Sequence, residues 1–208
     1  NNFGKHVHVE RFKEQLEHVC RHFKIIPLED LITKLRSETL TENSAVITFD
    51  DGYRNNYTAA FPVLKSMHAP ATIFLTAGFI DSERWFWTDK LEHTITNTEI
   101  SVLPVKGMDA SFELFDVSLK KKAVIDIKKR LKQCNETTLS DITEEIYSSC
   151  GVDDIPPFEN YECLKWHEII EMSNDNISFG AHTVNHIILS RYPLERAKEE
   201  IRLSQKIM

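Results

Sequence analysis

The chain has 208 residues, of which 41% are hydrophobic and 27% are charged, and this excludes a wholly disordered protein. Its formal net charge of −7 argues against nucleic acid as a partner and fits a neutral or cationic partner better than a polyanion. The sequence contains no signal peptide and no apolar run long enough to span a bilayer. The chain starts without methionine and stops inside a helical pattern, so we expect both ends to be cut.

The first elements alternate between helix and strand. Apolar spacing predicts helices over residues 9–23 and 28–36, and then a strand over 45–49. A helix over 53–67 follows, with Pro62 disfavoured in its middle, and then a strand over 71–76. This alternation predicts an α/β fold, either a parallel sheet or a barrel.

The pattern changes after residue 96. Two short strands with a turn at 106–109 are predicted within 96–116, and two amphipathic helices are predicted over 119–133 and 139–149. We expect this α+β segment to be an insertion at about 96–160, ending near Pro156 and Pro157. The remaining predicted elements are a helix over 164–172, a strand over 176–179 and a helix over 193–207.

Two adjacent carboxylates, Asp50 and Asp51, directly follow the strand predicted over 45–49. Carboxylates are costly to place beside a buried strand, and active sites of parallel α/β folds lie at the carboxyl ends of strands. One acid can bind a metal ion while its neighbour accepts a proton. Gly52 allows the sharp turn that would let both side chains face one site. An ordinary Asp-Gly turn is the alternative.

Two histidines, His182 and His186, follow the strand predicted over 176–179. Residues four apart share one face of a helical turn, so we expect both imidazoles to reach one metal ion, with a carboxylate from another strand end as third ligand. The alternative is a pair of unrelated surface histidines. His18 and His22 have the same spacing but lie inside a predicted helix without an acid pair, and we interpret them as solvated or packing residues.

Aromatic residues and cysteines carry weaker signals. Trp85 and Trp87 are candidate substrate-binding residues because aromatic faces stack on sugar rings, although packing of the predicted insertion against the barrel is the preferred interpretation. None of the four cysteines forms a CxxC pair, so we expect mostly buried thiols without a metal role.

The motifs TFDDG at 48–52 and HTVNH at 182–186 resemble the first two motifs of the polysaccharide deacetylase family, which is the NodB homology domain of carbohydrate esterase family 4. Residues 28–31, 70–75 and 164–166 are also similar to that family, and the likeness is weakest over 96–160. The resemblance implies a single catalytic domain over residues 1–208 with a distorted (β/α) barrel.

By position in these motifs, the resemblance implies that Asp50 is the general base. It likewise implies that Asp51, His182 and His186 hold one divalent metal ion, usually Zn²⁺ in this family. The family's later Arg-x-Pro-aromatic and Leu-x-His motifs are not found, and the Arg-Tyr-Pro-Leu segment at 191–194 departs from the first of them at its last position. We therefore expect an incomplete barrel that lacks its C-terminal part, with no general acid assigned.

The function that follows is the removal of N-acetyl or O-acetyl groups from an amino-sugar polysaccharide or oligosaccharide. Two alternatives stay open. One is a deacylase or deformylase of a small or lipid-linked N-acyl sugar, and the other is a non-catalytic homologue that binds metal and carbohydrate. A cell-envelope or secreted location fits the family, while the sequence identifies neither the glycan, the compartment nor the oligomeric state.

Overall fold

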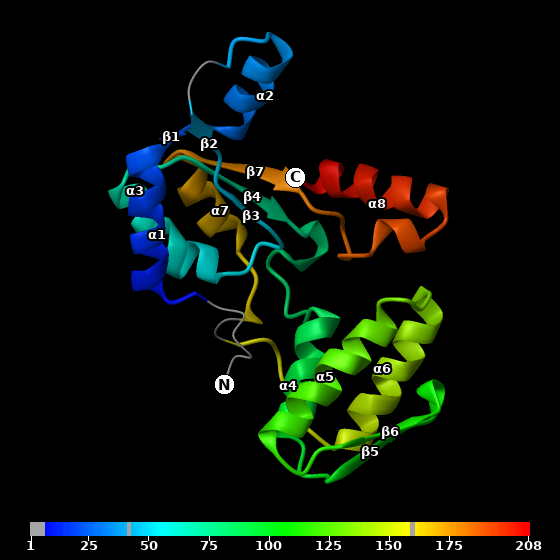
Figure 1. Cartoon of the computed structure of the whole chain (residues 1–208). Helices are drawn as coiled ribbons and strands as arrows, with labels where there is room; N and C mark the ends of the chain where they lie inside the picture. The colour runs from blue at the N-terminus through cyan, green and yellow to red at the C-terminus, as the bar shows by residue number, and fades with distance from the viewer. Residues whose placement is uncertain (1–6, 41–42, 159–160) are drawn as a thin grey trace. The chain divides into compact units, whose positions relative to one another are not determined.

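The computed structural model describes residues 7–40, 43–158 and 161–208, which divide into two compact units (Figure 1). The first unit comprises the chain up to Glu83, Phe158–Ile187 and Lys198–Met208, and the second comprises Arg84–Pro157 and Ile188–Ala197. Among the described residues, no helix combines the length and the apolar character needed to cross a membrane.

The first unit alternates helices and short parallel strands. Its elements are α1 (Val9–His22), β1 (Lys24–Ile25), α2 (Leu28–Arg36), β2 (Ser44–Ala45), β3 (Thr48–Phe49), a π-helical turn (Asn56–Ala60), α3 (Phe61–Ser66), β4 (Ala71–Leu75), a 3₁₀ turn (Ala77–Phe79), α7 (Trp166–Ser173) and β7 (Ile177–Ala181). Helix α8 (Leu194–Ile207) contributes its part from Lys198 onward. The predicted α/β class is confirmed, and α1 and α2 lie within a residue of their expected bounds.

The described strands form small sheets and no closed barrel. Strands β3, β4 and β7 form one parallel sheet in the order β3-β4-β7, while β1 and β2 form a separate parallel pair. The single strand predicted over 45–49 is therefore divided, because β2 pairs with β1 and β3 pairs with β4. A short apolar run does not reveal that its two halves have different partners.

Pro62 alters the helix predicted over 53–67. Proline has no N–H to donate, so a continuous α-helix through this position would leave a carbonyl unpaired. The chain instead forms a π-helical turn over Asn56–Ala60, in which the Phe61 N–H donates to the Asn56 carbonyl, and α3 then begins with Pro62 in its first turn. The predicted helix is thus present but divided.

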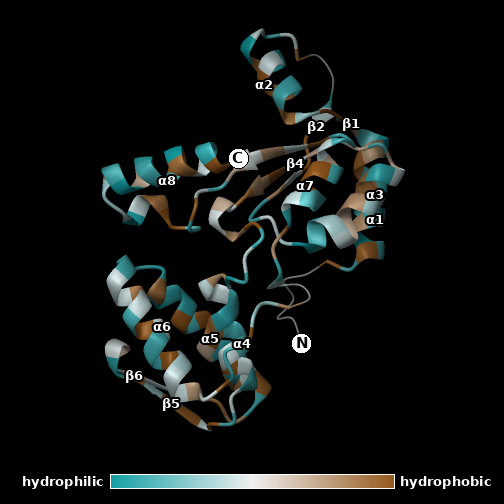
Figure 2. Ribbon diagram, turned by 180° about the vertical axis from the view of Figure 1, so that it is seen from behind, coloured by the Kyte–Doolittle hydropathy of each residue, from teal (hydrophilic) through white to brown (hydrophobic). Residues whose placement is uncertain are grey.

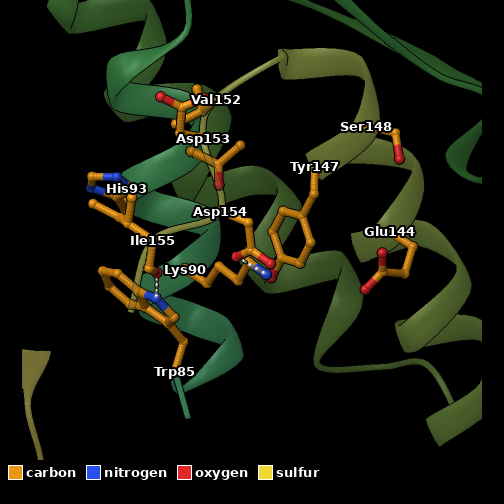
Figure 3. A pocket seen from close by; sticks show the side chains of 11 residues that line it. Trp85, Lys90, His93, Glu144, Tyr147, Ser148, Val152, Asp153, Asp154 and Ile155 are labelled. Atoms are coloured by element: carbon orange, nitrogen blue, oxygen red, sulfur yellow. Dashed lines mark hydrogen bonds and ion pairs between the residues drawn. The ribbon is translucent and has the colours of Figure 1, made fainter. Parts of the chain in front are cut away.

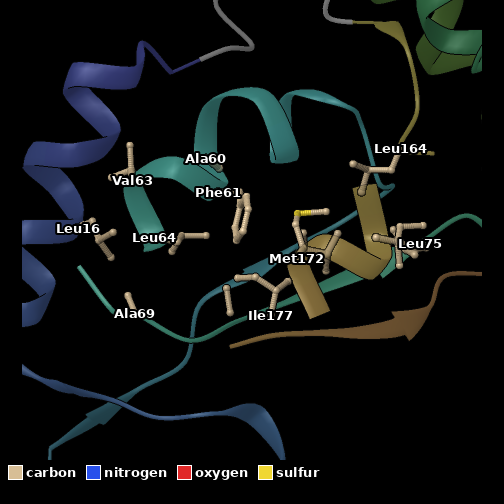
Figure 4. Close-up of a cluster of buried hydrophobic side chains, with 13 residues drawn as sticks. Leu16, Ala60, Phe61, Val63, Leu64, Ala69, Leu75, Leu164, Met172 and Ile177 are labelled. Carbon is tan, nitrogen blue, oxygen red and sulfur yellow. The ribbon is translucent and has the colours of Figure 1, made fainter. Parts of the chain in front are cut away.

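The core of the first unit lies between the β3-β4-β7 sheet and the helices α1, α3 and α7 (Figure 4). Its fully buried members include Leu64 of α3, Ile73 and Leu75 of β4, and Met172 of α7. Because β4 is central, neighbours cover its edges and the buried cluster covers its side chains, which explains its continuous apolar sequence.

The second unit packs three helices against a hairpin (Figures 1 and 2). Its elements are α4 (Trp87–Asn97), β5 (Val102–Val105), a 3₁₀ turn (Lys106–Met108), β6 (Ala110–Glu113), α5 (Val117–Leu131), α6 (Glu136–Cys150) and a further 3₁₀ turn (Leu189–Arg191). The hairpin and both helices predicted within 96–149 are confirmed. Side chains of Asp116 and Asn135 accept backbone hydrogen bonds at the starts of α5 and α6, which fixes where these helices begin.

Helix α4 is absent from the predicted elements. Its residues include Thr88, Thr94 and Ile95, whose β-branched side chains lower helix propensity, and no side chain caps its N-terminus. Packing in the core of the second unit stabilises it, since Leu91 and Ile95 are fully buried. This compact unit therefore starts at Arg84, ahead of the boundary expected near residue 96, and its origin as an insertion stays a prediction.

The four cysteines are all described and form no disulfide. Cys150 and Cys163 are buried, while Cys20 is exposed and Cys134 is half-buried. The expectation of mostly buried thiols therefore holds for two of the four.

Candidate metal and active site

The parallel sheet brings the predicted ligands to one edge. Asp51 follows the end of β3, and His182 follows the end of β7, with β4 between these two strands. Because all three strands run in the same direction, their carboxyl ends meet at this edge. The fold thus joins two motifs that lie far apart in the sequence.

Asp51, His182 and His186 form a cluster in which one ligand atom of each lies within 4.8 Å of the others. The Oδ1 atom of Asp51 lies 3.0 Å from Nε2 of His186 and 3.6 Å from Nε2 of His182. Ligand atoms bound tetrahedrally at about 2.1 Å from one zinc ion would be about 3.4 Å apart. Two imidazoles and one carboxylate at these separations fit a single divalent ion with one position left open.

Strand β4 and the residue after it fix the backbone of Asp51 and His182. The Thr76 N–H donates to the Asp51 carbonyl at 3.2 Å, and the His182 N–H donates to the Leu75 carbonyl at 2.8 Å. Asp51 itself is in the left-handed region, with φ of 71°, and is followed by Gly52 at 82°. A left-handed non-glycine residue costs about 1–2 kcal/mol. These backbone bonds therefore support a strained turn at the site.

The prediction of a helical turn at the histidines is wrong. Residues 182–186 form an irregular loop, in which Thr183 has φ of 64° and His186 has φ of 55°. These left-handed residues interrupt helical geometry, yet the two imidazole centroids still lie 5.5 Å apart. The four-residue spacing therefore predicted correctly that the two imidazoles lie close together. The backbone that brings them together is an irregular loop and not the expected helical turn.

The electrostatics of the cluster favour an ionised carboxylate. Burial raises the pKa of Asp51, but the hydrogen bond from His186 and the charges of His186 and His182 outweigh it, so the pKa lies below its ordinary value. Asp51 is thus held in the form that binds a cation.

Asp50 lies beside this cluster with a different environment. Its side chain is exposed, and its carbonyl accepts the Gly52 N–H at 2.9 Å, which closes the turn. An exposed carboxylate next to a metal ligand can exchange protons with water. The adjacent acids therefore differ in environment, with Asp51 half-buried and Asp50 exposed, while the predicted division of their chemical roles stays a prediction.

Beyond these residues, the described part of the chain has no second group of three metal-binding side chains. His18 and His22 are exposed on α1 with ring centroids 4.5 Å apart, but no third ligand joins them. Their exposure on α1 matches the interpretation of these histidines as solvated residues.

Trp85 and Trp87 both belong to the second unit. The Trp85 indole donates to the Ile155 carbonyl at 2.8 Å and stacks on His93 with centroids 5.3 Å apart. It lines a cleft of about 230 Å³ in which Lys90 pairs with Asp154 (Figure 3). Trp87 packs against the core of that unit. Their role in substrate binding stays a prediction.

Two buried glutamates near the motifs escaped the sequence reasoning. Glu168 accepts from Arg54 Nε at 2.7 Å and thereby ties the segment after Gly52 to α7. Glu200 of α8 accepts backbone hydrogen bonds from the loop between the two histidines. Both residues are fully buried. Neither residue belongs to a recognisable motif. In the sequence, a buried glutamate of a charge-rich helix cannot be distinguished from the exposed charged residues beside it.

Comparison with known proteins finds relatives that are named as deacetylases. The protein YxkH of Bacillus subtilis (strain 168), a polysaccharide deacetylase by name, is 28% identical over 130 residues, which cover 55% of this chain and 46% of YxkH. The poly-beta-1,6-N-acetyl-D-glucosamine N-deacetylase of Staphylococcus epidermidis (strain ATCC 35984 and synonyms) is 36% identical over 74 residues, 35% of this chain and 26% of that protein. The chain thus spans about half or less of the length of these relatives.

The fold is similar to that of the Streptococcus pyogenes deacetylase PplD, solved in complex with acetate. The TM-score is 0.55 at 17% identity, and the match covers 96% of this chain and 56% of PplD. Residues 37–208 match the polysaccharide deacetylase family, and this range contains both motifs and the whole Asp51, His182 and His186 cluster. The chain belongs to the polysaccharide deacetylase family.

Proposed function

We propose that this chain is a metal-dependent deacetylase that removes N-acetyl groups from an amino-sugar polysaccharide. The observation that carries the proposal is the convergence of Asp51, His182 and His186 at one sheet edge, with Asp50 exposed beside them. Membership of the polysaccharide deacetylase family supports the same reaction class.

Asp51, His182 and His186 would hold the metal ion. Zinc is the proposed ion because two nitrogens and one carboxylate oxygen are a common donor set for catalytic zinc, with the fourth position open. When bound there, zinc polarises a carbonyl group and lowers the pKa of water. The low pKa of Asp51 keeps its carboxylate available as a ligand.

Asp50 is the proposed general base. Its carboxylate takes a proton from water as the water oxygen bonds to the acetamide carbonyl carbon. The bond between this carbon and the sugar nitrogen then breaks, and the nitrogen gains a proton from solvent. The products are acetate and a free amino group on the sugar. The exposure of Asp50 suits this role because the proton must later return to solvent.

The proposed substrate is a polymer containing N-acetylglucosamine. The Staphylococcus epidermidis relative is named for that activity, and the net charge of −7 suits a neutral substrate whose product becomes cationic. Trp85 is retained as a proposed sugar-stacking side chain, since it lines a cleft of the second unit.

Acetate release from N-acetylglucosamine oligomers by the zinc-loaded chain tests the proposal. Asp50→Asn should keep one zinc per chain and lose at least about 100-fold in kcat, because the amide cannot act as the base. The matched control is Asp109→Asn, which removes an exposed carboxylate of the second unit and should leave kcat unchanged. Ordinary turnover by Asp50→Asn would contradict the assignment of the base. No acetate release by the zinc-loaded wild type would contradict the proposed reaction.

A further inference from the structure

The loop between the two histidines is held on both sides. On one side, the N–H groups of Ala77 and Gly78 donate to the carbonyls of Thr183 and Val184 at 2.9 and 3.0 Å. These bonds extend the pairing of β4 with β7 beyond the ends of the strands. They leave the N–H groups of the loop to be satisfied from elsewhere.

Glu200 provides acceptors on the other side. Its Oε2 atom accepts from the N–H groups of Val184 and Asn185, both at 2.9 Å, and its Oε1 atom accepts from Nδ2 of Asn185 at 2.7 Å. The Glu200 side chain is fully buried. A carboxylate offers only acceptors, and each of these three groups is a donor, so the pairing is chemically complementary.

The loop needs such support because its conformation is unfavourable on its own. Thr183 and His186 both have left-handed φ angles, and a non-glycine residue keeps such an angle only where its surroundings enforce it. Val184 and Asn185 lie between the two histidines, so the position of their backbone determines how the two imidazoles approach Asp51.

We propose that Glu200 is a positioning residue for the metal site, acting through the backbone of Val184 and Asn185 and the side chain of Asn185. The inference rests on the proposed metal-dependent function. Glu200 holds the loop that carries His182 and His186 in the conformation that binds a divalent ion.

Metal affinity tests this role independently of turnover. Zinc affinity is measured by competition with a chromophoric chelator, and the visible spectrum of the Co²⁺-loaded chain reports the ligand geometry. Glu200→Ala should bind zinc about 10–100-fold more weakly and change the Co²⁺ spectrum, since loss of a partner that orients ligands typically has this effect. The matched control is Glu199→Ala, which removes the neighbouring exposed carboxylate and should bind zinc like the wild type.

A swapped pair separates positioning from general stability. Asn185→Asp places a second carboxylate against Glu200 and should weaken zinc binding at least about 10-fold. Adding Glu200→Gln should restore most of this affinity, because the glutamine oxygen can accept the backbone N–H groups while its amide donates to the new carboxylate. Circular dichroism confirms in each case that the chain is folded at the assay temperature.

The outcomes are distinct. If Glu200→Ala binds zinc as tightly as the wild type, Glu200 is not a positioning residue. If Glu200→Ala does not fold, the Asn185→Asp and Glu200→Gln variants provide the test. The proposed pairing of Glu200 with Asn185 is wrong if the double variant does not recover the zinc affinity that Asn185→Asp loses. A wild-type chain that binds no divalent ion would instead contradict the proposed function.

Discussion

Replacement of Gly52 by alanine should destabilise the chain at the last residue of its first motif, TFDDG at 48–52. Gly52 has φ of +82°, where an alanine costs about 1–2 kcal/mol. The added Cβ would also lie 2.6 Å from Cδ2 of Leu75. Leu75 is 1% exposed within the core, so relieving this contact requires repacking that costs about 1–3 kcal/mol. The expected loss in the free energy of unfolding is therefore about 2–5 kcal/mol.

Gly151→Ala is the matched control. Gly151 has φ of +60°, but a Cβ at this position would meet no atom within 4 Å. Its expected cost is only the backbone part, about 1–2 kcal/mol. Urea unfolding followed by circular dichroism measures both variants against the wild type.

The contact with Leu75 can be tested separately. In a Leu75→Ala background the colliding atom is absent, so Gly52→Ala should cost no more than Gly151→Ala does in the wild type. A Gly52→Ala variant of the 208-residue chain with Leu75 intact that loses no more stability than Gly151→Ala would refute the proposed collision. It would also show that the turn after Asp51 is less tightly packed than described.

Four further outcomes are expected. His186→Ala should abolish stoichiometric zinc binding measured by atomic absorption, and one zinc per chain would disprove its ligand role. Glu168→Ala should lower the free energy of unfolding by about 1–3 kcal/mol in urea titrations, since it removes a charged hydrogen-bond partner of Arg54. A change within experimental error would show that the bond between Arg54 and Glu168 does not stabilise the chain. Burial lowers the pKa of His93, so the unfolded state binds more protons and stability should fall as pH drops below about 6.5, an effect that His93→Gln should reduce. Tryptophan fluorescence during unfolding measures this, and an equal pH slope in both proteins would count against it. Trp85→Ala should raise KM for N-acetylglucosamine oligomers at constant zinc content, whereas an unchanged KM would remove it from the substrate site.

Features set by local periodicity could be predicted from the sequence. The apolar spacing of α1 and α2 and the hairpin of β5 and β6 gave bounds close to those observed. The proximity of Asp51, His182 and His186 was also predictable, because the motifs place these residues after strand ends and parallel strands share one edge.

Features set by distant partners could not be predicted. Helix α4 is stabilised by burial of Leu91 and Ile95 rather than by propensity. The division between β2 and β3 depends on which strand each half contacts. Glu200 looks like any other charged residue of α8, and only the folded loop shows that its carboxylate is enclosed by N–H donors. The sequence contains the residues, but the partners come from the tertiary structure.

The pairing of β4 with β7 also has a kinetic consequence. It aligns Leu75 with Ala181, residues more than a hundred positions apart in the chain. Closing so long a loop is an entropic barrier, and contacts of this range form slowly compared with helices such as α1. Asp51, His182 and His186 come together only after this step, so a refolding chain should regain helical circular dichroism before it binds zinc at the proposed site. The rate of zinc binding during refolding would then report the rate at which β4 pairs with β7.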